Sequence, residues 1–360
     1  MVELLILLIK LFVVFNLIMG LASICTWIER KGSALIQDRV GANRAGAFVE
    51  TDNILLKPVF YVLRVLGMLG IINTLVNDGV KALTKEDFVP EGVSNFMHSL
   101  APFLAVFPVF VAFALLPFAP DFTVSGYHIR AQVAPLDAGL LFIFAMGSMA
   151  VYGVALAGWT GNNKFSLLGG LRAAAQMISY ELAMGVTFVT VIITYGTLDL
   201  YEIVERQQYG LGILATITQP ISFIILFVVG MAETKRGPFD LPESESELVA
   251  GYFTEYSGMK FLLFWLGEFA EIALFAAIIV LLFFGGWKIP FVELPAGSWL
   301  SALIGHAVLM GKILFFCVLQ IVLRWTLPRF RYDQLMHLGW KILLPLSMVN
   351  LVVAAALKVL

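Results

Sequence analysis

The sequence predicts an all-α integral membrane protein with about eight transmembrane helices. Of its 360 residues, 60% are apolar and only 13% are charged, and the mean hydropathy is +0.92. Several apolar stretches reach the roughly 20 residues that a helix needs to cross a hydrocarbon core of about 30 Å. Backbone N–H and C=O groups in lipid must bond within the protein, which favours helices over an open sheet.

The predicted spans follow one another without a flexible linker or a convincing internal repeat. In chain order they cover residues 4–28, 97–119, 136–159, 174–195, 212–232, 259–284, 301–327 and 340–360. The first stretch lacks a small-residue cleavage site and is long enough to span, so we expect a retained helix. Residues 1–360 are therefore predicted to form a single polytopic membrane domain.

The loop charges predict the orientation, because lysine and arginine are enriched in cytoplasmic loops. The loops after the first, third, fifth and seventh spans hold most of the loop lysines and arginines. The other three loops hold only Arg130, Arg206 and Lys288. We therefore expect both termini to face outward, with long cytoplasmic loops after the first and fifth spans.

Residues 53–76 are apolar enough to resemble a ninth span. If this segment crossed the membrane, the basic loops after it would move outside and the charge bias would reverse. The internal Lys57, Pro58 and Arg64 also suit a helix that lies in the membrane interface. We predict an extra interfacial apolar helix here.

Composition excludes several classes of function. The net charge of −2 argues against a nucleic-acid partner. The only cysteines, Cys25 and Cys317, lie in apolar stretches, which excludes a cysteine-ligated iron–sulfur cluster or zinc site within this chain. The four histidines form no ligand spacing, and no phosphate-binding loop or nucleophile motif is present. We expect no metal site and no redox centre in this chain.

The most unusual stretch is the acidic loop, residues 232–256, which reads AETKRGPFDLPESESELVAGYFTEY between two apolar spans. Against Lys235 and Arg236 it carries the acids Glu233, Asp240, Glu243, Glu245, Glu247 and Glu255. The acids after Pro242 suit the first turn of a helix, where the helix dipole favours negative charge. The dipole does not explain the acids further upstream, so we interpret the loop as one that carries or relays charge.

Three further acids lie inside predicted spans, where ionisable residues are costly and suggest function. Glu181 lies in the fourth span, and Glu268 and Glu271 lie three residues apart on one face of the sixth. Buried carboxyl groups can exchange protons near neutral pH. A structural hydrogen bond to a neighbouring helix or partner subunit is the alternative.

Two more charged segments lie at membrane boundaries. After the first span, Glu29, Arg30 and Arg39 precede Asp78 and Lys81, which are three residues apart as on a helix. Near the last span, arginines follow one another in RWTLPRFRYDQLMHLGWK, residues 324–341, and could pair with carboxylates. Anchoring of the orientation is the alternative for both segments.

These motifs together resemble the H subunit of bacterial NADH:quinone oxidoreductase, respiratory complex I, and its mitochondrial equivalent. The matching pieces, in order, are ERK at 29–31, QDRVGANRAG at 37–46, DGVKALTKE at 78–86, LRAAAQMISYE at 171–181, ETKRGPFDLPESESELVAGYFTEYS at 233–257 and PRFRYDQLMHLGWK at 328–341. The spacing from Gly46 to Asp78 is longer than is usual in that family, and the extra residues include part of 53–76.

The resemblance implies a translocase subunit of the respiratory chain in the bacterial inner membrane. Such a subunit forms the narrow tunnel by which ubiquinone or menaquinone reaches the terminal iron–sulfur cluster, and it couples quinone reduction to proton translocation. It binds no cofactor covalently, since NADH, FMN and the iron–sulfur clusters belong to partner subunits. The implied partners are the protein that carries the terminal cluster, a neighbouring peripheral-arm subunit, small membrane subunits and membrane lipid.

The resemblance also implies roles for individual residues. Those implied at the quinone tunnel are Glu29, Arg30 and Arg39. Those implied for the proton path are Glu181, Glu233, Asp240, Glu243, Glu245, Glu247 and Glu268. Supporting charges are implied at Asp78, Lys81, Arg236, Arg329 and Arg331.

Two other functions stay open from the sequence. One is a structural or proton-relay anchor in a related membrane-bound hydrogenase or other oxidoreductase, without a quinone tunnel. The other is a stand-alone ion transporter, against which the chain shows neither an inverted repeat nor paired broken helices. Co-purifying iron–sulfur and flavin proteins that bind NADH would distinguish these classes.

Overall fold

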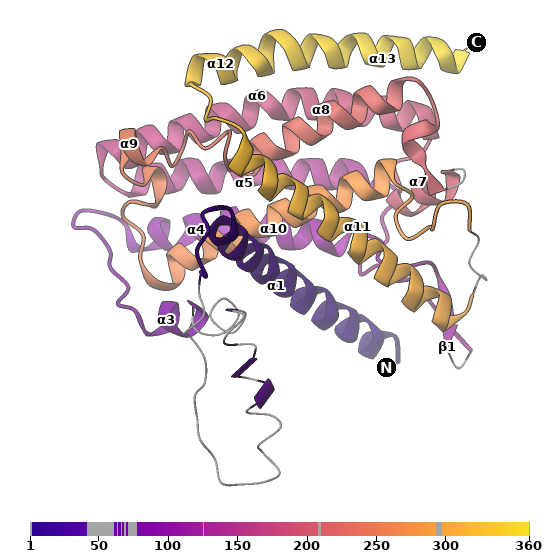
Figure 1. Ribbon diagram of the computed structural model, residues 1–360, viewed down its shortest axis with the longest axis horizontal. Coiled ribbons are helices and arrows are strands. Elements are labelled where there is room, and N and C mark those ends of the chain that lie inside the picture. The colour runs from indigo at the N-terminus through magenta and orange to yellow at the C-terminus, as the bar shows by residue number, and fades with distance from the viewer. Residues whose placement is uncertain are drawn as a thin grey trace.

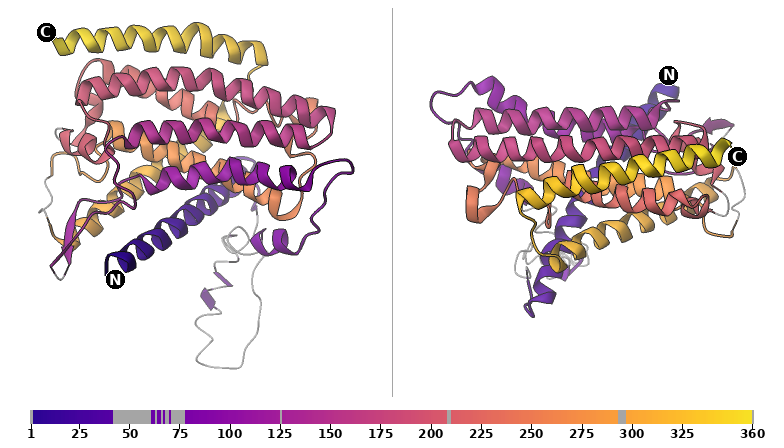
Figure 2. Two further views of the ribbon diagram at one scale, coloured as in Figure 1. Left: turned by 180° about the vertical axis from the view of Figure 1, so that it is seen from behind. Right: turned by 90° about the horizontal axis from the view of Figure 1, so that it is seen from above.

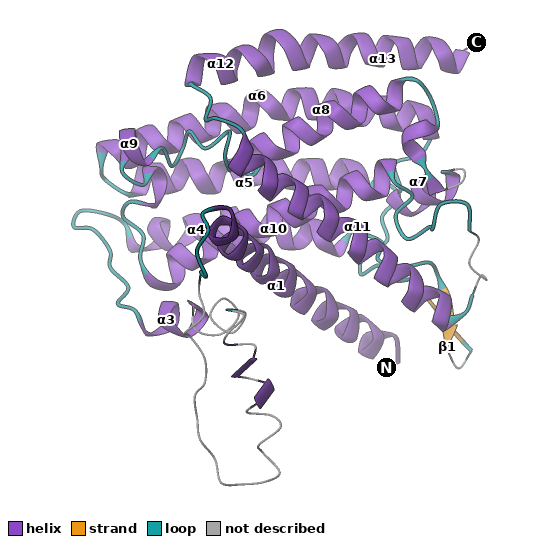
Figure 3. Ribbon diagram, in the orientation of Figure 1, coloured by secondary structure: helices purple, strands orange, loops and turns teal. Residues whose placement is uncertain are grey.

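The computed structural model describes residues 2–41, 61–62, 64–65, 67, 70, 78–124, 126–207, 210–292 and 297–359. The predicted interfacial segment 53–76 lies outside these described residues, apart from a few isolated positions. Helices account for most of the described chain, as the purple ribbons of Figure 3 show.

Within the described ranges, seven helices are long and apolar enough to cross a membrane. They are α1 (Val2–Ile36), α4 (Asn95–Ala114), α5 (Gly139–Thr160), α6 (Lys164–Tyr195), α10 (Gly258–Phe283), α11 (Trp299–Thr326) and the continuous stretch Tyr332–Val359. That stretch joins α12 (Tyr332–His337), the π-helix η5 (Leu338–Leu343) and α13 (Leu344–Val359). An eighth apolar helix, α8 (Thr218–Glu233), is shorter at 16 residues. The prediction of an all-α multi-pass membrane protein is confirmed.

Short elements lie at the two ends of the helix bundle (Figure 1). The end that we call the loop end carries α3 (Asp78–Thr84), α9 (Glu245–Leu248), η4 (Gly251–Phe253) and α12. The end that we call the terminus end carries both chain termini, β1 (Phe122–Val124), β2 (Tyr127–Ile129), α7 (Leu200–Arg206) and η3 (Gly212–Leu214). Since both termini lie at one end, the chain crosses the bundle an even number of times, as eight spans require.

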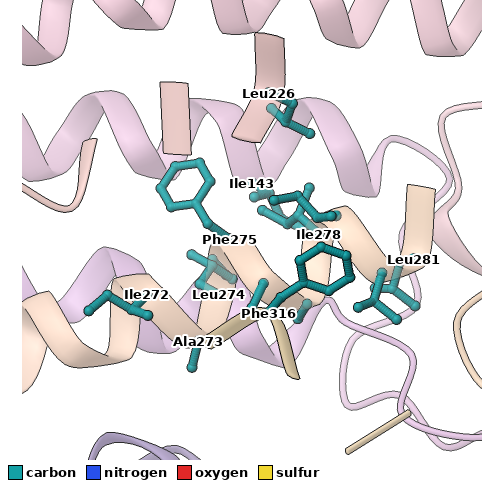
Figure 4. Packing of buried hydrophobic residues seen from close by; sticks show 14 of the residues in the cluster. Ile143, Leu226, Ile272, Ala273, Leu274, Phe275, Ile278, Leu281 and Phe316 are labelled. Atoms are coloured by element: carbon teal, nitrogen blue, oxygen red, sulfur yellow. The ribbon is translucent and has the colours of Figure 1, made fainter. Parts of the chain in front are cut away.

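The helix α10 lies at the centre of the bundle, and 94% of its most apolar 18-residue window is buried. A helix that is apolar all round belongs in the interior. It contacts α1, α4, α8 and α11, and the close view in Figure 4 shows residues of α10 packed against Ile143, Leu226 and Phe316. The acids that α10 carries are therefore held inside the protein.

Two polar side chains satisfy the backbone where α10 ends. The Lys312 ammonium group donates to the carbonyl oxygens of Phe284, Gly286 and Lys288, over 2.7, 2.9 and 2.7 Å. The Gln207 amide donates to the carbonyl oxygen of Leu281 over 2.6 Å. The last carbonyl groups of a helix lack partners within the helix, and a cation beside them is favourable. These bonds fix the terminus end of the central helix.

Glycines allow α4, α5 and α6 to approach closely, and Figure 2 shows these helices side by side. A Cβ atom at Gly153 of α5 would lie 2.4 Å from the backbone nitrogen of Ala105 in α4. A Cβ atom at Gly158 would lie 2.8 Å from the Cα atom of Gly170 in α6. Small residues permit such close backbone contacts between membrane helices.

We expect Gly153→Ala to lower the free energy of unfolding by about 1–3 kcal/mol, because the added methyl group would have to separate two backbones. Gly20 of α1 is the matched control, since nothing lies within 4 Å of a Cβ atom built there. Gly20→Ala should be neutral or slightly stabilising, by up to about 1 kcal/mol, because alanine favours helix. Thermal denaturation of the detergent-extracted protein measures both changes, and equal midpoints for the two variants would contradict the packing argument.

Candidate functional site

The acidic loop folds against the central helix rather than into solvent. Arg236 is buried, and its guanidinium Nη2 lies 2.7 Å from Oε2 of Glu268 on α10. The hydroxyl group of Tyr252 donates to Oε1 of the same carboxylate over 2.7 Å. The Arg236 guanidinium also lies over the ring of Phe269, 4.6 Å from its centroid. The loop and α10 are thus joined by an enclosed cation, carboxylate and phenol.

A second buried ion pair lies one helical turn further along α10. Lys235 Nζ is 3.4 Å from Oε2 of Glu271, and both side chains are almost wholly enclosed. Separating such a pair is costly, because the remaining charge would stay buried without a counter-charge. Consecutive basic residues of the loop therefore bind carboxylates three residues apart on one helix.

Glu233, the last residue of α8, lies beside these ion pairs but differs from the other acids. It is only 7% exposed, and its Oε1 atom has no hydrogen-bond partner among the described residues. Buried polar atoms are almost always hydrogen-bonded to protein or to ordered water. This carboxyl group therefore has the free bonding capacity that water or a proton could use.

A narrow internal cavity of about 40 Å³ brings Glu181, Glu233 and Glu271 together. Apart from these acids, mainly apolar residues of α4, α5, α6 and α10 form its lining. Glu181 accepts a hydrogen bond from Ser148, so it is held in place at the cavity wall. A polar cavity above about 15 Å³ can hold water, so this one has room for a short chain of water molecules. Carboxyl groups from three helices thus share one hydratable space.

Asp240 and Glu243 lie outside the spans, in the loop and close to arginine, and Asp240 is buried whereas Glu243 is partly buried. Burial raises the pKa of Asp240, partly offset by Arg329, whose guanidinium lies 2.8 Å from the Asp240 carboxylate. Burial and the neighbouring Glu268 raise the pKa of Glu243 to about 8, against the opposing effect of Arg236. Glu243 can therefore exchange a proton near physiological pH.

The last two acids of the predicted path lie further out, where the loop forms α9. Glu247 is more than half exposed and pairs with Arg172 of α6 over 2.6 Å. An exposed ion pair of this kind contributes little to stability. Glu245 begins α9, and its side chain lies outside what the structure describes.

The residues predicted at the quinone tunnel do not share one pocket among the described residues. Glu29 pairs with Arg324 over 2.5 Å beside a cavity of about 10 Å³ that Arg236 also lines. Arg30 pairs with Asp78 over 2.6 Å. The cavity is barely large enough for a single ordered water, so it does not by itself admit a quinone ring.

The other predicted charges lie at the surface of the loop end. The Arg39 guanidinium donates to the Gln37 side chain over 2.8 Å, and both groups are exposed. Arg331 lies 3.3 Å from Asp333, also at an exposed position. Lys81 is exposed on α3. No group of three metal-ligating side chains lies together within the described part of the chain.

Comparison with known proteins assigns the family. The model of the NADH dehydrogenase family matches residues 9–355. An H subunit of the NADH-quinone oxidoreductase of Geobacter metallireducens is 43% identical over 344 residues, 96% of this chain and 94% of that protein. The chain belongs to the NADH dehydrogenase family.

An H subunit from Syntrophobacter fumaroxidans is 44% identical, over 98% of this chain and 96% of its own length. The corresponding protein of Rhodothermus marinus, NADH-quinone oxidoreductase subunit 8, is 43% identical, over 96% of this chain and 94% of its own length. The resemblance to the H subunit is confirmed.

The residue roles implied by the resemblance left out several residues that complete this site. Lys235 and Tyr252 bind the α10 carboxylates, and Glu271, rather than Glu268, lines the cavity with Glu181. The spacing of Glu268 and Glu271 indicated a shared helix face but not which acid would face the cavity. The signal available in the sequence was that a lysine and a tyrosine lie in the same loop as the predicted acids.

Titration of Glu243 should make stability depend on pH. Its folded pKa of about 8 lies above its ordinary value of 4.5, so the folded state binds the additional proton between these values. Stability is then fully present below about pH 4.5 and falls as the pH rises through about 8. We expect the thermal midpoint of the assembled complex to decrease between about pH 5 and pH 8, where the unfolded carboxyl is ionised and the folded one still holds its proton, and to level off above this range.

Glu243→Gln should flatten this decrease, whereas Glu202→Gln, an exposed acid on α7 paired with Arg206, should leave it unchanged. Infrared spectroscopy provides a direct check, because a protonated carboxyl band at neutral pH should be lost in the Glu243 variant alone. An identical pH profile in wild type and Glu243→Gln would contradict the assignment.

Proposed function

We propose that this chain is the membrane subunit of an NADH-quinone oxidoreductase, respiratory complex I, which guides quinone to its reduction site and couples that reduction to proton translocation. The observation that carries the proposal is the buried carboxyl system of the loop end. Paired acids at the acidic loop adjoin the cavity shared by Glu181, Glu233 and Glu271. Family membership supplies the reaction, and the charge arrangement supports the coupling role.

Arg236 lies where a change of charge at the loop end would alter its ion pair with Glu268 on α10. It contacts Glu268 at 2.7 Å, lies near Glu243 and lines the small cavity beside Glu29. Unit charges about 4 Å apart attract by roughly 4 kcal/mol at an effective dielectric constant of 20. An anion that formed near Arg236 would therefore compete with Glu268 for this cation, and the Glu268 carboxylate would then favour a proton.

The next step would pass from Glu268 to the neighbouring pair. A proton on Glu268 would remove one negative charge near Lys235, which would then bind Glu271 more strongly. Lys235 would also attract the Glu233 carboxylate more strongly, so a proton held on Glu233 would leave it and pass through the cavity water to an ionised Glu181, which lines the same space. The signal would thus travel along α10 by changes in ion pairing, and the path would leave the loop end towards the bundle interior.

The same proposal assigns the remaining components to partners. NADH, FMN and the iron–sulfur clusters would reside in partner subunits, and ubiquinone or menaquinone would be the substrate. The protein that carries the terminal cluster would dock at the loop end, where Glu29, Arg30 and Arg39 lie. Small membrane subunits would continue the proton path, and the complex would lie in the bacterial inner membrane.

Glu233→Gln is the sharpest test of the proton path, because no ion pair of Glu233 is described and the amide has nearly the same shape. We expect proton pumping in proteoliposomes to fall by about tenfold or more, since general acid–base groups commonly contribute 10²–10⁴-fold. The complex should still assemble with its full set of subunits. Glu202→Gln is the matched control on the surface. Undiminished pumping by an assembled Glu233→Gln complex would exclude Glu233 from the path.

Photolabelling with an azido-quinone tests the quinone route separately. Label that excess ubiquinone displaces should map to the last turns of α1, which hold Glu29 and Arg30, and to the segment after it, which holds Arg39. Arg39→Gln should weaken this label without changing the amount of assembled complex, because its guanidinium is exposed and bonds only locally to Gln37. Labelling that ubiquinone does not displace would instead favour a structural anchor without a quinone site.

A further inference from the structure

A second large cavity lies at the terminus end, away from the acidic loop. It measures about 520 Å³ and lies between α1, the segment around the β1–β2 hairpin, and α11. We call it the terminus-end groove. Its lining is almost entirely apolar and includes Ile9, Val13, Phe122 and Leu303. Neither the proton path nor the predicted quinone tunnel uses any of its residues.

Two nitrogen-bearing side chains are the titratable groups in the lining. Lys10 of α1 donates to the carbonyl oxygen of Gln132 over 3.2 Å, and His306 of α11 bonds through Nδ1 to the carbonyl of Phe118 over 3.2 Å. An ammonium group has three N–H donors, so this single bond leaves Lys10 with further capacity. No aspartate or glutamate belongs to the described lining.

One acid lies close to Lys10 without belonging to the lining of the groove. Asp121 interacts electrostatically with Lys10, and its carboxylate lies 3.9 Å from His128. Its Oδ1 atom is enclosed, its Oδ2 atom faces His128, and its side chain is about a quarter exposed, so the carboxylate partly offsets the charge of Lys10 without lining the groove. The groove therefore offers positive charge at its polar site and hydrocarbon elsewhere.

The position of Lys10 suits a lipid phosphate. It lies eight residues after Val2, which places it about 12 Å along α1 from the helix start. Lysine side chains at such depths extend towards the headgroup region while their methylene groups stay in the apolar layer. Ile9 and Val13 on the same helix are more than half exposed, so the groove opens to the surrounding lipid.

The size of the groove distinguishes between occupants. An α-helix with side chains is about 10 Å wide and occupies roughly 400 Å³ for each 5.4 Å turn. The groove therefore holds little more than one turn, whereas a spanning partner helix has more than five. Its volume lies within the range of about 300–1,000 Å³ that is typical of small-molecule sites. One acyl chain of a lipid is a better match than a protein segment.

We propose that the terminus-end groove binds one anionic phospholipid, with an acyl chain against the apolar lining and the phosphate on Lys10 and His306. Lys10 would supply charge-assisted hydrogen bonds, and His306 would be oriented by its bond to the Phe118 carbonyl. This site would be specific for an anionic headgroup, in contrast to ordinary boundary lipid.

The test uses the assembled complex in phosphatidylcholine vesicles that contain a trace of diazirine-labelled phosphatidylglycerol or, in parallel, equally labelled phosphatidylcholine. Mass spectrometry then maps the cross-linked peptides. We expect phosphatidylglycerol to label the groove segments of α1 and α11 about tenfold more than phosphatidylcholine. One additional charge-assisted hydrogen bond to the anionic lipid would produce a difference in affinity of about this size.

Two variants and one control test the groove. Lys10→Gln should reduce phosphatidylglycerol labelling to the phosphatidylcholine level. Val13→Trp, at a lipid-exposed position, should fill the groove and reduce both labels even if the Lys10 variant fails to assemble. Lys358→Gln is the matched control, since Lys358 is an exposed lysine at the end of α13 whose ammonium donates to the Thr194 carbonyl.

Several outcomes would overturn the proposal. Equal labelling by both lipids would show ordinary boundary lipid, and displacement of the label by ubiquinone would make the occupant a quinone. Cross-links to a partner subunit without lipid label in the groove would show that a protein covers it. Preserved labelling in Val13→Trp would place the lipid elsewhere. Pumping and quinone reduction are measured in the same samples, so failure of this site is distinguishable from failure of the proton path.

Discussion

The burial of ion pairs between the acidic loop and α10 is the constraint on which the rest of the structure depends. Charges cannot leave water without counter-charges, and α10 has few positions where polar groups could be tolerated. Arg236 and Lys235 neutralise Glu268 and Glu271, and in doing so they fix the loop against the central helix. The remaining helices enclose this contact, with glycines in α5 and α6 allowing backbones to approach. The opposite end of α10 is held by Lys312 and Gln207.

The length and hydropathy of the apolar stretches were sufficient to predict nearly every span. Differences arise where charged residues continue a helix beyond the membrane. The fourth span was predicted from residue 174, whereas α6 begins at Lys164, after Asn163 accepts a hydrogen bond from the Phe165 backbone. The last span was predicted from residue 340, but the helical stretch begins at Tyr332. Hydropathy reports where lipid begins, while capping and packing decide where a helix begins.

The candidate site was only partly accessible from sequence. The acids themselves could be identified because carboxyl groups in apolar segments are costly and conspicuous. Their partners could not, because ion pairs such as Arg236 with Glu268 join residues that are far apart in the chain. The difference between Glu268, which binds the loop, and Glu271, which faces the cavity, depends on the rotation of α10 within the bundle. Such a rotation is set by packing against several helices and not by the sequence of α10 alone.

Some acids of this system are paired with a buried cation and others are not, and this difference affects how the acids could transmit charge. A fully paired carboxylate is held in one ionisation state, because protonating it would strand a buried cation. A buried carboxyl group remote from every charge would stay neutral and would likewise carry no signal. Here the paired acids at α10 adjoin Glu233, whose Oε1 has no described partner, across a space that can hold water. A small change in pairing at the loop can therefore change which of the neighbouring acids holds a proton. Uniform pairing would have given stability without this response.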